Sequence, residues 1–174
     1  MAFNVGDQVI YGVHGVCRIV EIEKERKGSE VNEYYKLRPV FNDKATVFVP
    51  KENEKLVARM RRILSADEII QLIHEIPREE GTWIMDENVR KEQYKKILSG
   101  GDRKELMRLI KMLYLRQQER TNGRSKKLYK NDEKAMHDAE KMLYDEFAYV
   151  LDIKREQVIP FIMEQIEVKA RAGA

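Results

Sequence analysis

The period of the hydrophobic pattern changes once along the chain, at Ser65, and this change constrains the fold more than any other feature. Before Ser65, short runs rich in Val, Ile, Tyr and Phe are separated by turn residues, which is typical of β-strands. After Ser65, apolar residues recur every three or four positions, which is typical of amphipathic helices. The sequence therefore predicts an α+β protein with a β-domain over residues 1–64 and a helical domain over residues 65–174.

Five short strands are expected in the first domain. They are predicted at residues 7–11, 16–25, 33–41, 46–49 and 56–63. Such a small number of short strands cannot form a large sandwich, and it fits a small, curved SH3/Tudor-like β-barrel. The first domain is therefore predicted to be a five-stranded barrel.

The second domain is expected to be a bundle of about five helices. Ser65 and Glu68 have the spacing of a capping box, which places the start of the first helix. The later helices are predicted at residues 87–98, at residues 102–120, from Asn131 or Asp132 onward, and from Asp152 onward, with Pro160 kinking the last helix or delaying its start.

The chain has a single tryptophan, Trp83, in a polar connection just before the second of these helices. A tryptophan buries a large aromatic surface, so one interpretation is that Trp83 closes a small helical core. The other interpretation is an exposed apolar wedge beside a basic surface, as in proteins that insert side chains into the minor groove of DNA. Both interpretations depend on the charges around it.

Charge is segregated along the helical domain. Residues 87–130 contain 14 Lys and Arg against 5 Asp and Glu, a net charge of +9, between two segments, 65–86 and 131–152, of −5 each. Val89, Tyr94 and Ile97 are expected to face inward on the second helix, with Arg90, Lys91, Lys95 and Lys96 toward solvent. The surplus favours an anionic partner, because Lys and Arg that neutralise phosphates release counterions. The alternative is that acidic helices simply pack beside basic ones.

Few features support an enzyme. His14, His74 and His137 are far apart and lack metal-binding spacing, so neither a metal site nor a cofactor is expected. Nucleophile and nucleotide-binding motifs are missing as well. Cys17 has no second cysteine to pair with and is expected to be a small core residue. Without a long apolar run or a secretory signal, the protein is expected in the cytoplasm and away from membranes.

The opening residues carry a family resemblance. FNVGDQVIY at residues 3–11, followed by His14-Gly15-Val16, resembles the CarD-like transcription regulators, whose N-terminal module also occurs in the transcription-repair coupling factor. Further matches occur at Tyr34, Val49-Pro50, Trp83, residues 99–102 and Gln118-Glu119-Arg120. The resemblance therefore covers nearly the whole chain.

The resemblance implies a monomeric regulator with two binding surfaces. Its barrel would dock on the β subunit of RNA polymerase through a strand edge, and its helical domain would lie over promoter DNA at the upstream edge of the melted bubble. Trp83 would insert at the minor groove and stabilise the open complex. The residues implied in largely sequence-independent DNA binding are Trp83, Arg90, Lys91, Arg116, Arg120 and Lys134, and those implied in polymerase binding are Arg26, Lys27 and Phe48.

Two departures from the family pattern qualify this expectation. The stretch 84–88 separates Trp83 from Arg90, whereas relatives place basic residues closer to the tryptophan. Phe48 and Glu25 occupy positions where some relatives have arginines, so the docking surface is expected to be more apolar. Phe48 also has an alternative place in the barrel core, because it alternates with Val47 and Val49.

Two other classes of function remain as alternatives. One is a protein-only adaptor that docks on RNA polymerase or an acidic partner without touching DNA. The other is a hydrolase or nuclease, for which the sequence offers no cluster of acids or metal ligands.

Overall fold

The computed structural model describes residues 2–76, 82–121, 124–125 and 127–173. Its backbone contacts divide the chain into two compact units, Met1–Leu64 (unit 1) and Ser65–Ala174 (unit 2). The two units have different architectures.

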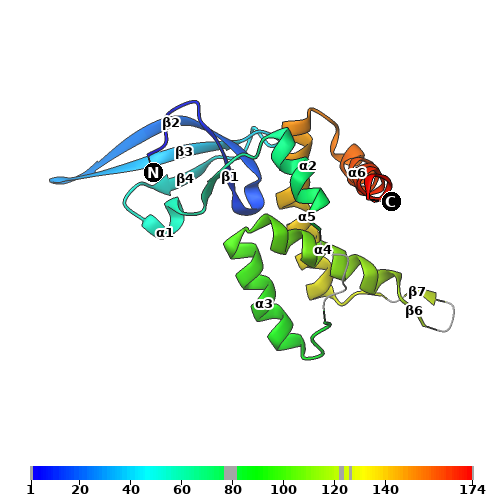
Figure 1. Ribbon diagram of the computed structural model, residues 1–174. Coiled ribbons are helices and arrows are strands. Elements are labelled where there is room, and N and C mark those ends of the chain that lie inside the picture. Colours follow the sequence, from blue (N-terminus) through cyan, green and yellow to red (C-terminus); the bar gives the residue numbers. More distant parts are fainter. Residues whose placement is uncertain (1, 77–81, 122–123, 126, 174) are drawn as a thin grey trace. The chain divides into compact units, whose positions relative to one another are not determined.

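Unit 1 is a five-stranded antiparallel sheet with the strand order β4-β3-β2-β1-β5 (Figure 1). Its elements are β1 (Gln8–Tyr11), η1 (Gly12–His14), β2 (Val16–Lys27), β3 (Glu30–Pro39), β4 (Val47–Pro50), α1 (Glu54–Val57) and β5 (Met60–Arg62). The predicted strand number and fold class are confirmed. The sheet is not closed, so the predicted barrel describes it only loosely.

The predicted strand over residues 56–63 is wrong in its first half. The side chain of Asn53 accepts a hydrogen bond from the Leu56 amide at 3.2 Å and caps the short helix α1. Only Met60–Arg62 is left to pair with β1. The local cap therefore outweighs the strand propensity of this segment.

Alternation along the strands builds the core of unit 1. The buried cluster contains Val9, Cys17, Ile19, Tyr35, Leu37, Val49 and Met60. Strands β2 and β3 continue past the short strands beside them, with pairing out to Lys27 and Glu30, whereas β4 pairs only with Tyr34–Leu37 of β3. They form a two-stranded ribbon that projects from the sheet (Figure 1).

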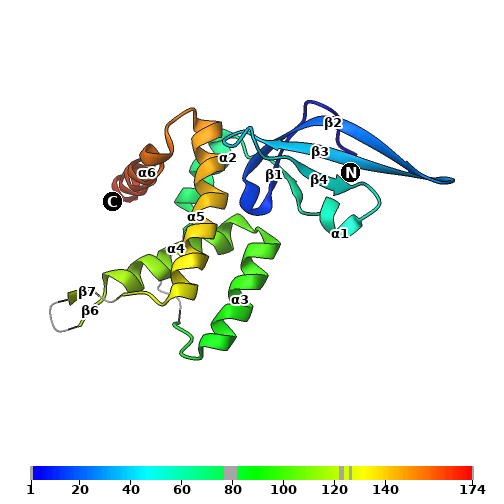
Figure 2. The same cartoon turned by 180° about the vertical axis from the view of Figure 1, so that it is seen from behind.

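Unit 2 is a helical bundle, as predicted. Its elements are α2 (Ala66–His74), α3 (Glu87–Gly100), α4 (Arg103–Gln118), β6 (Arg120–Thr121), β7 (Arg124–Ser125), α5 (Lys130–Leu151), η2 (Arg155–Gln157) and α6 (Val158–Ala172). The 22-residue helix α5 is the centre of the bundle and contacts α2, α3, α4 and α6 (Figure 2). None of the described helices is both long and apolar enough to cross a membrane.

Two of the predicted helix ends are confirmed by hydrogen bonds. Ser65 and Glu68 form the complete capping box at the start of α2. Gly101 ends α3 with φ +63°, a left-handed conformation that favours glycine, and Asp102 then caps α4 by accepting from the Glu105 amide at 3.0 Å.

The predicted ends around α5 and α6 need correction. Tyr129, not Asn131 or Asp132, occupies the N-cap position of α5. Asp152 ends α5 in a left-handed conformation instead of starting the next helix. The last helix starts at Val158, later than predicted, and Pro160 is its third residue, where the missing N–H costs no intrahelical hydrogen bond.

Three buried carboxylates of α5 each pair with an arginine from another element. Asp132, Asp145 and Glu146 are 1%, 5% and 1% exposed. Their partners are Arg90 of α3, Arg155 of η2 and Arg103 of α4, with closest distances of 3.2, 3.2 and 2.8 Å. The alternative in which acidic helices pack beside basic ones is therefore confirmed for Arg90 and Arg103, the two arginines that belong to the basic segment 87–130.

Candidate functional site

Trp83 lies in the segment that leads into α3, and its side chain is half-buried. The guanidinium carbons of Arg90 and Arg116 are each 4.6 Å from the centroid of its ring. Both distances fall within the range of cation–π attraction. Trp83 is thus neither a fully buried core residue nor a free side chain, and two arginines hold the indole at the surface of unit 2.

Arg90 is the most connected residue around Trp83. Its Nε and Nη2 donate to the two carboxylate oxygens of Asp132 at 3.2 and 3.3 Å. Its Nη1 donates to the carbonyl oxygens of Ile84 and Met85 at 2.9 and 3.0 Å. Arg90 therefore ties the chain next to Trp83 to the first turn of α5.

Tyr94, one turn after Arg90 on α3, adds a hydrogen bond to the ion pair of Arg90 and Asp132. Its hydroxyl donates to Oδ1 of Asp132 at 2.6 Å. Burial, together with this hydrogen bond, raises the pKa of Tyr94 above its ordinary value. Burial alone would lower the pKa of Arg90, but the hydrogen bonds and charge of Asp132 outweigh it, and the pKa is raised. Both groups therefore keep their protons at neutral pH.

The inner face of α3 differs from the predicted one. Arg90 is 3% exposed instead of facing solvent, and Val89 is 52% exposed instead of facing inward. Tyr94 is buried, as predicted, and Arg90 shares its face at a spacing of four residues. The carboxylate of Asp132 on α5 explains the difference, because it compensates a buried guanidinium. In this position the guanidinium of Arg90 is bonded to Asp132 and has little contact with solvent.

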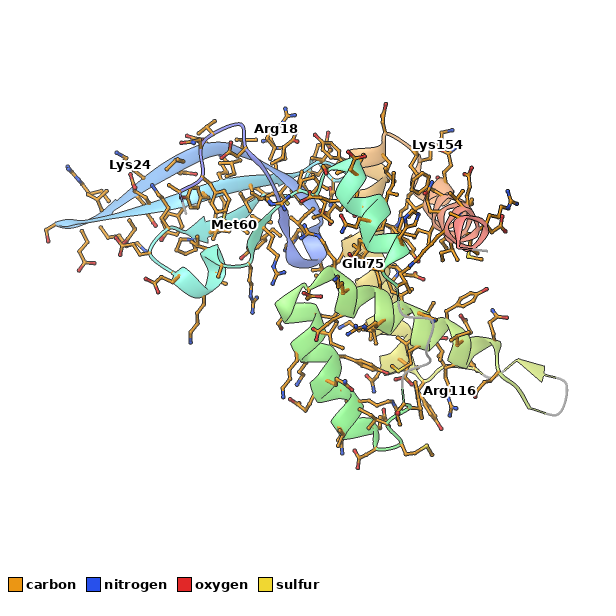
Figure 3. The ribbon with its side chains drawn as sticks, in the orientation of Figure 1. Arg18, Lys24, Met60, Glu75, Arg116 and Lys154 are labelled. Carbon is orange, nitrogen blue, oxygen red and sulfur yellow. The ribbon has the colours of Figure 1, made fainter. Side chains whose placement is uncertain are left out.

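Arg116 of α4 contacts the same indole. Its side chain is labelled in Figure 3. Its side chain is 21% exposed, and its Nη1 donates to Glu119 at 2.8 Å. The side chain of Arg90 is 4% exposed, so that of Arg116 is the more accessible of the two arginine side chains that contact Trp83.

A groove of about 500 Å³ lies beside Trp83, between α3 and α4. The apolar residues that line it are Ile97, Leu109, Met112 and Leu115, and the aromatic ones are Trp83 and Tyr94. Arg108, Lys111 and Arg116 contribute positive charge, against Glu105 and Glu119. An aromatic wall combined with basic side chains is the surface on which proteins bind nucleic-acid strands.

The other predicted DNA contacts are distributed over three elements. Lys91 is half-buried on α3, with its Nζ 3.8 Å from Glu87. Lys134 is exposed on α5. Arg120 is the first residue of β6, and its side chain lies outside the described part of the chain. Among the predicted DNA contacts, the structure brings together Trp83, Arg90 and Arg116.

Sequence reasoning missed Asp132 and Tyr94 as parts of this site. Asp132 has the residue type and position of a helix cap, and Tyr94 has the spacing of an ordinary core residue. The one available signal was the acidic surplus of the segment that contains Asp132. It indicates pairing with a basic helix but not which residues pair.

In unit 1, Phe48 faces away from the core. It is 50% exposed on β4, whereas its neighbour Val49 is fully buried. The alternative place for Phe48 in the core is therefore wrong. The Nζ of Lys36, its cross-strand partner, lies 5.9 Å from the phenyl ring. Phe48 is thus an exposed aromatic residue on an edge strand of the sheet.

Arg26 and Lys27 are exposed near the end of the β2–β3 ribbon. They pair with Val31 and Glu30 of β3, whereas Phe48 pairs with Lys36. Val31 and Lys36 are five steps apart along an extended strand, which is about 17 Å. The three predicted polymerase contacts therefore do not form one cluster.

Within the described residues, no group of three or more His, Cys, Asp and Glu side chains is arranged to hold a metal ion.

A comparison with known families matches residues 3–64 to the CarD-like/TRCF RID domain. The matched region contains every strand of unit 1. Residues 3–64 are therefore similar to a transcription-related family of RNA polymerase-interacting domains. This match confirms the resemblance carried by the opening motif, for this part of the chain.

Proposed function

We propose that the protein is a non-enzymatic transcription regulator that binds RNA polymerase through unit 1 and promoter DNA through unit 2, and that it stabilises the open promoter complex. The observation that carries this proposal is the placement of Trp83. The indole is held at the surface by two arginines, beside a groove that contains Arg108 and Lys111.

The polymerase contact is proposed to involve the β subunit and the edge of the sheet formed by β4. An edge strand offers unpaired backbone groups to which a strand of the partner can add. The exposed ring of Phe48 would supply an apolar contact beside that strand. Arg26 and Lys27, on the ribbon, would contact a separate part of the polymerase surface.

The DNA contact is proposed to be largely independent of sequence. Lys91, Arg116 and Lys134 would bind phosphates, which fixes the position of unit 2 without reading bases. Arg120 is retained in this set from the family resemblance. Arg90 is assigned a different role, because its guanidinium is buried and occupied by Asp132.

The proposed action of Trp83 is to oppose closure of the melted bubble. An indole inserted at the minor groove beside an opened base pair contacts only the open form of the promoter. Because it binds one state of a two-state equilibrium, it shifts the population toward that state. The effect should be largest on promoters whose closed form is otherwise favoured.

The test compares the lifetime of the open complex with wild-type protein and with Trp83→Ala. The measurement is the half-life of polymerase–promoter complexes after a competitor is added. The variant should shorten the half-life toward that of polymerase alone while still co-purifying with polymerase. The matched control is Tyr114→Ala, which removes an aromatic side chain that is 52% exposed on α4. An unchanged half-life with Trp83→Ala would overturn the proposal that Trp83 opposes closure of the bubble.

The protein-only adaptor predicts a different salt dependence. If unit 2 binds phosphates, its affinity for promoter DNA should fall steeply as the salt concentration rises. If unit 2 binds an acidic protein face, the full chain should bind polymerase but add no affinity for DNA. A salt titration of binding to polymerase–promoter complexes separates the two functions.

A further inference from the structure

Asp132 is linked to Trp83 through a single intermediate side chain, that of Arg90. We propose that Asp132 is a positioning residue for Trp83, and that the buried pair of Asp132 and Arg90 sets the direction in which the indole is presented to DNA. This inference rests on the proposed function, since it concerns how the DNA-contacting tryptophan is held.

The first step is the geometry of the guanidinium. Its five N–H donors lie in one rigid plane. Two of its nitrogens, Nε and Nη2, donate to opposite oxygens of Asp132. A bidentate pair of this kind fixes the orientation of the whole plane. The direction of the third nitrogen, Nη1, is then set as well.

The second step is the contact between Nη1 and the backbone. Nη1 donates to the carbonyl oxygens of Ile84 and Met85, the two residues that follow Trp83. The same guanidinium lies 4.6 Å from the indole centroid. One side chain therefore holds both the ring of Trp83 and the backbone that carries it. Asp86 fixes the far end of this segment by capping α3.

The third step is the burial of the pair. Asp132 and Arg90 are 1% and 3% exposed, and Tyr94 donates a further hydrogen bond to Asp132. A buried ion pair is costly to desolvate and adds little stability compared with apolar packing. What such a pair does supply is a defined geometry, because its hydrogen bonds are directional. In this protein the group whose position the pair defines is the indole of Trp83.

A second buried pair on the same helix provides a matched control. Glu146 of α5 is 1% exposed and accepts two hydrogen bonds from Arg103, at 2.9 and 2.8 Å. It joins α5 to α4, just as Asp132 joins α5 to α3. Neither Glu146 nor Arg103 lines the groove beside Trp83. Disrupting this pair should therefore affect stability without redirecting the indole.

The experiment uses the full chain and the fluorescence of its only tryptophan. Asp132→Asn keeps the shape of the side chain and removes its charge. In the folded variant, we expect red-shifted Trp83 emission, more quenching by acrylamide, and an open-complex half-life close to that of Trp83→Ala. Binding to polymerase should be unchanged. Arg90→Lys should give the same result, because an ammonium keeps the charge but loses the planar fork.

Glu146→Gln is measured in parallel, with the thermal midpoint of each variant. It should lower the midpoint and leave both the Trp83 emission and the half-life as in wild type. If Asp132→Asn does not fold, Tyr94→Phe is the milder variant, since it removes only one donor to Asp132. The inference is overturned if Asp132→Asn or Tyr94→Phe is folded with unchanged emission and quenching, or if Glu146→Gln changes them equally.

Failure of the inference and failure of the proposed function give different results. An Asp132→Asn protein with wild-type fluorescence and half-life, beside a shortened half-life for Trp83→Ala, overturns only the positioning role. A Trp83→Ala protein with the wild-type half-life overturns the wedge. The fluorescence change in Asp132→Asn would then still support positioning of the indole.

Discussion

The arginines of unit 2 have different surroundings, although each contributes the same positive charge to the net charge. The side chains of Arg90 and Arg103 are 4% and 16% exposed, and each is bonded to a buried carboxylate of α5. Arg108 is exposed and lines the groove beside Trp83. The charge of +9 on residues 87–130 therefore overstates what a DNA strand would meet. The surroundings of each residue decide which charges are structural.

Cys17 makes the stability of unit 1 sensitive to alkaline pH. It is fully buried, and burial raises its pKa from 9.0 to about 12. Below about pH 9 the thiol is neutral in both the folded and the unfolded chain; above it, only the unfolded chain ionises. The stability that Cys17 contributes is thus fully present below about pH 9 and is lost as the pH rises toward 12.

We therefore expect the free energy of unfolding to fall more between about pH 8 and about pH 10 for wild type than for Cys17→Ala. Urea titrations at the two pH values measure this difference. As an independent check, a thiol reagent should modify Cys17 in urea and not in the folded protein. Equal pH dependence of the two proteins would contradict the prediction.

At the scale of elements, the helix ends that depend on neighbouring residues were predictable from the sequence. The Ser65 capping box and the Gly101 helix end involve residues only a few positions apart, and both are found as expected. Either Asn131 or Asp132 was expected to cap a helix, but the partners of Asp132 are Arg90 and Tyr94, 42 and 38 residues away. A pattern read along one helix cannot show such a partner. The same limit explains why Arg90 was expected at the surface.

The capping box of α2 gives a prediction about unit 2. Ser65→Ala removes the acceptor for the Glu68 amide and leaves that donor unpaired at the start of a nine-residue helix. The free energy of unfolding of unit 2 should fall by about 1 kcal/mol. Chemical denaturation followed by circular dichroism measures the loss. Ser99→Ala, in the last turns of α3, is the control and should cost nothing.

The basic residues of α4 give a prediction about DNA binding. Arg108→Glu places a negative charge in the groove beside Trp83, where it would repel the phosphates of DNA bound against unit 2. Affinity for promoter DNA should fall, and the slope of log K against log salt should decrease by about 1 for each phosphate that the variant no longer binds. Lys154→Glu makes the same charge change outside the groove. An equal loss of affinity with both variants would indicate a general effect of net charge.

At the scale of the whole molecule, the two units differ in how far the sequence specifies them. Unit 1 carries a specific motif and alternating strands, and both its fold class and its family were predictable. The open sheet of unit 1 was not predictable. Closure into a barrel depends on the lengths and stagger of all five strands, which short sequence patterns do not determine. In unit 2 the helices were predictable, whereas the environment of Trp83 depends on three helices meeting.

The final prediction is that the covalent link between the units is required for function. Each unit has its own buried core, so residues 1–64 and residues 65–174 should fold as separate fragments. The first fragment should bind polymerase and compete with the full chain. The second should bind promoter DNA only weakly, because without the link its local concentration at the promoter is no longer raised by polymerase binding.

Adding both fragments together tests this directly. The half-life of the open complex should stay near that of polymerase alone at fragment concentrations where the full chain is fully effective, since tethering replaces a bimolecular encounter by an intramolecular one. A full effect from the mixture would contradict the prediction. It would mean that unit 2 has its own affinity for the complex, and that Trp83 reaches the bubble without being delivered by unit 1.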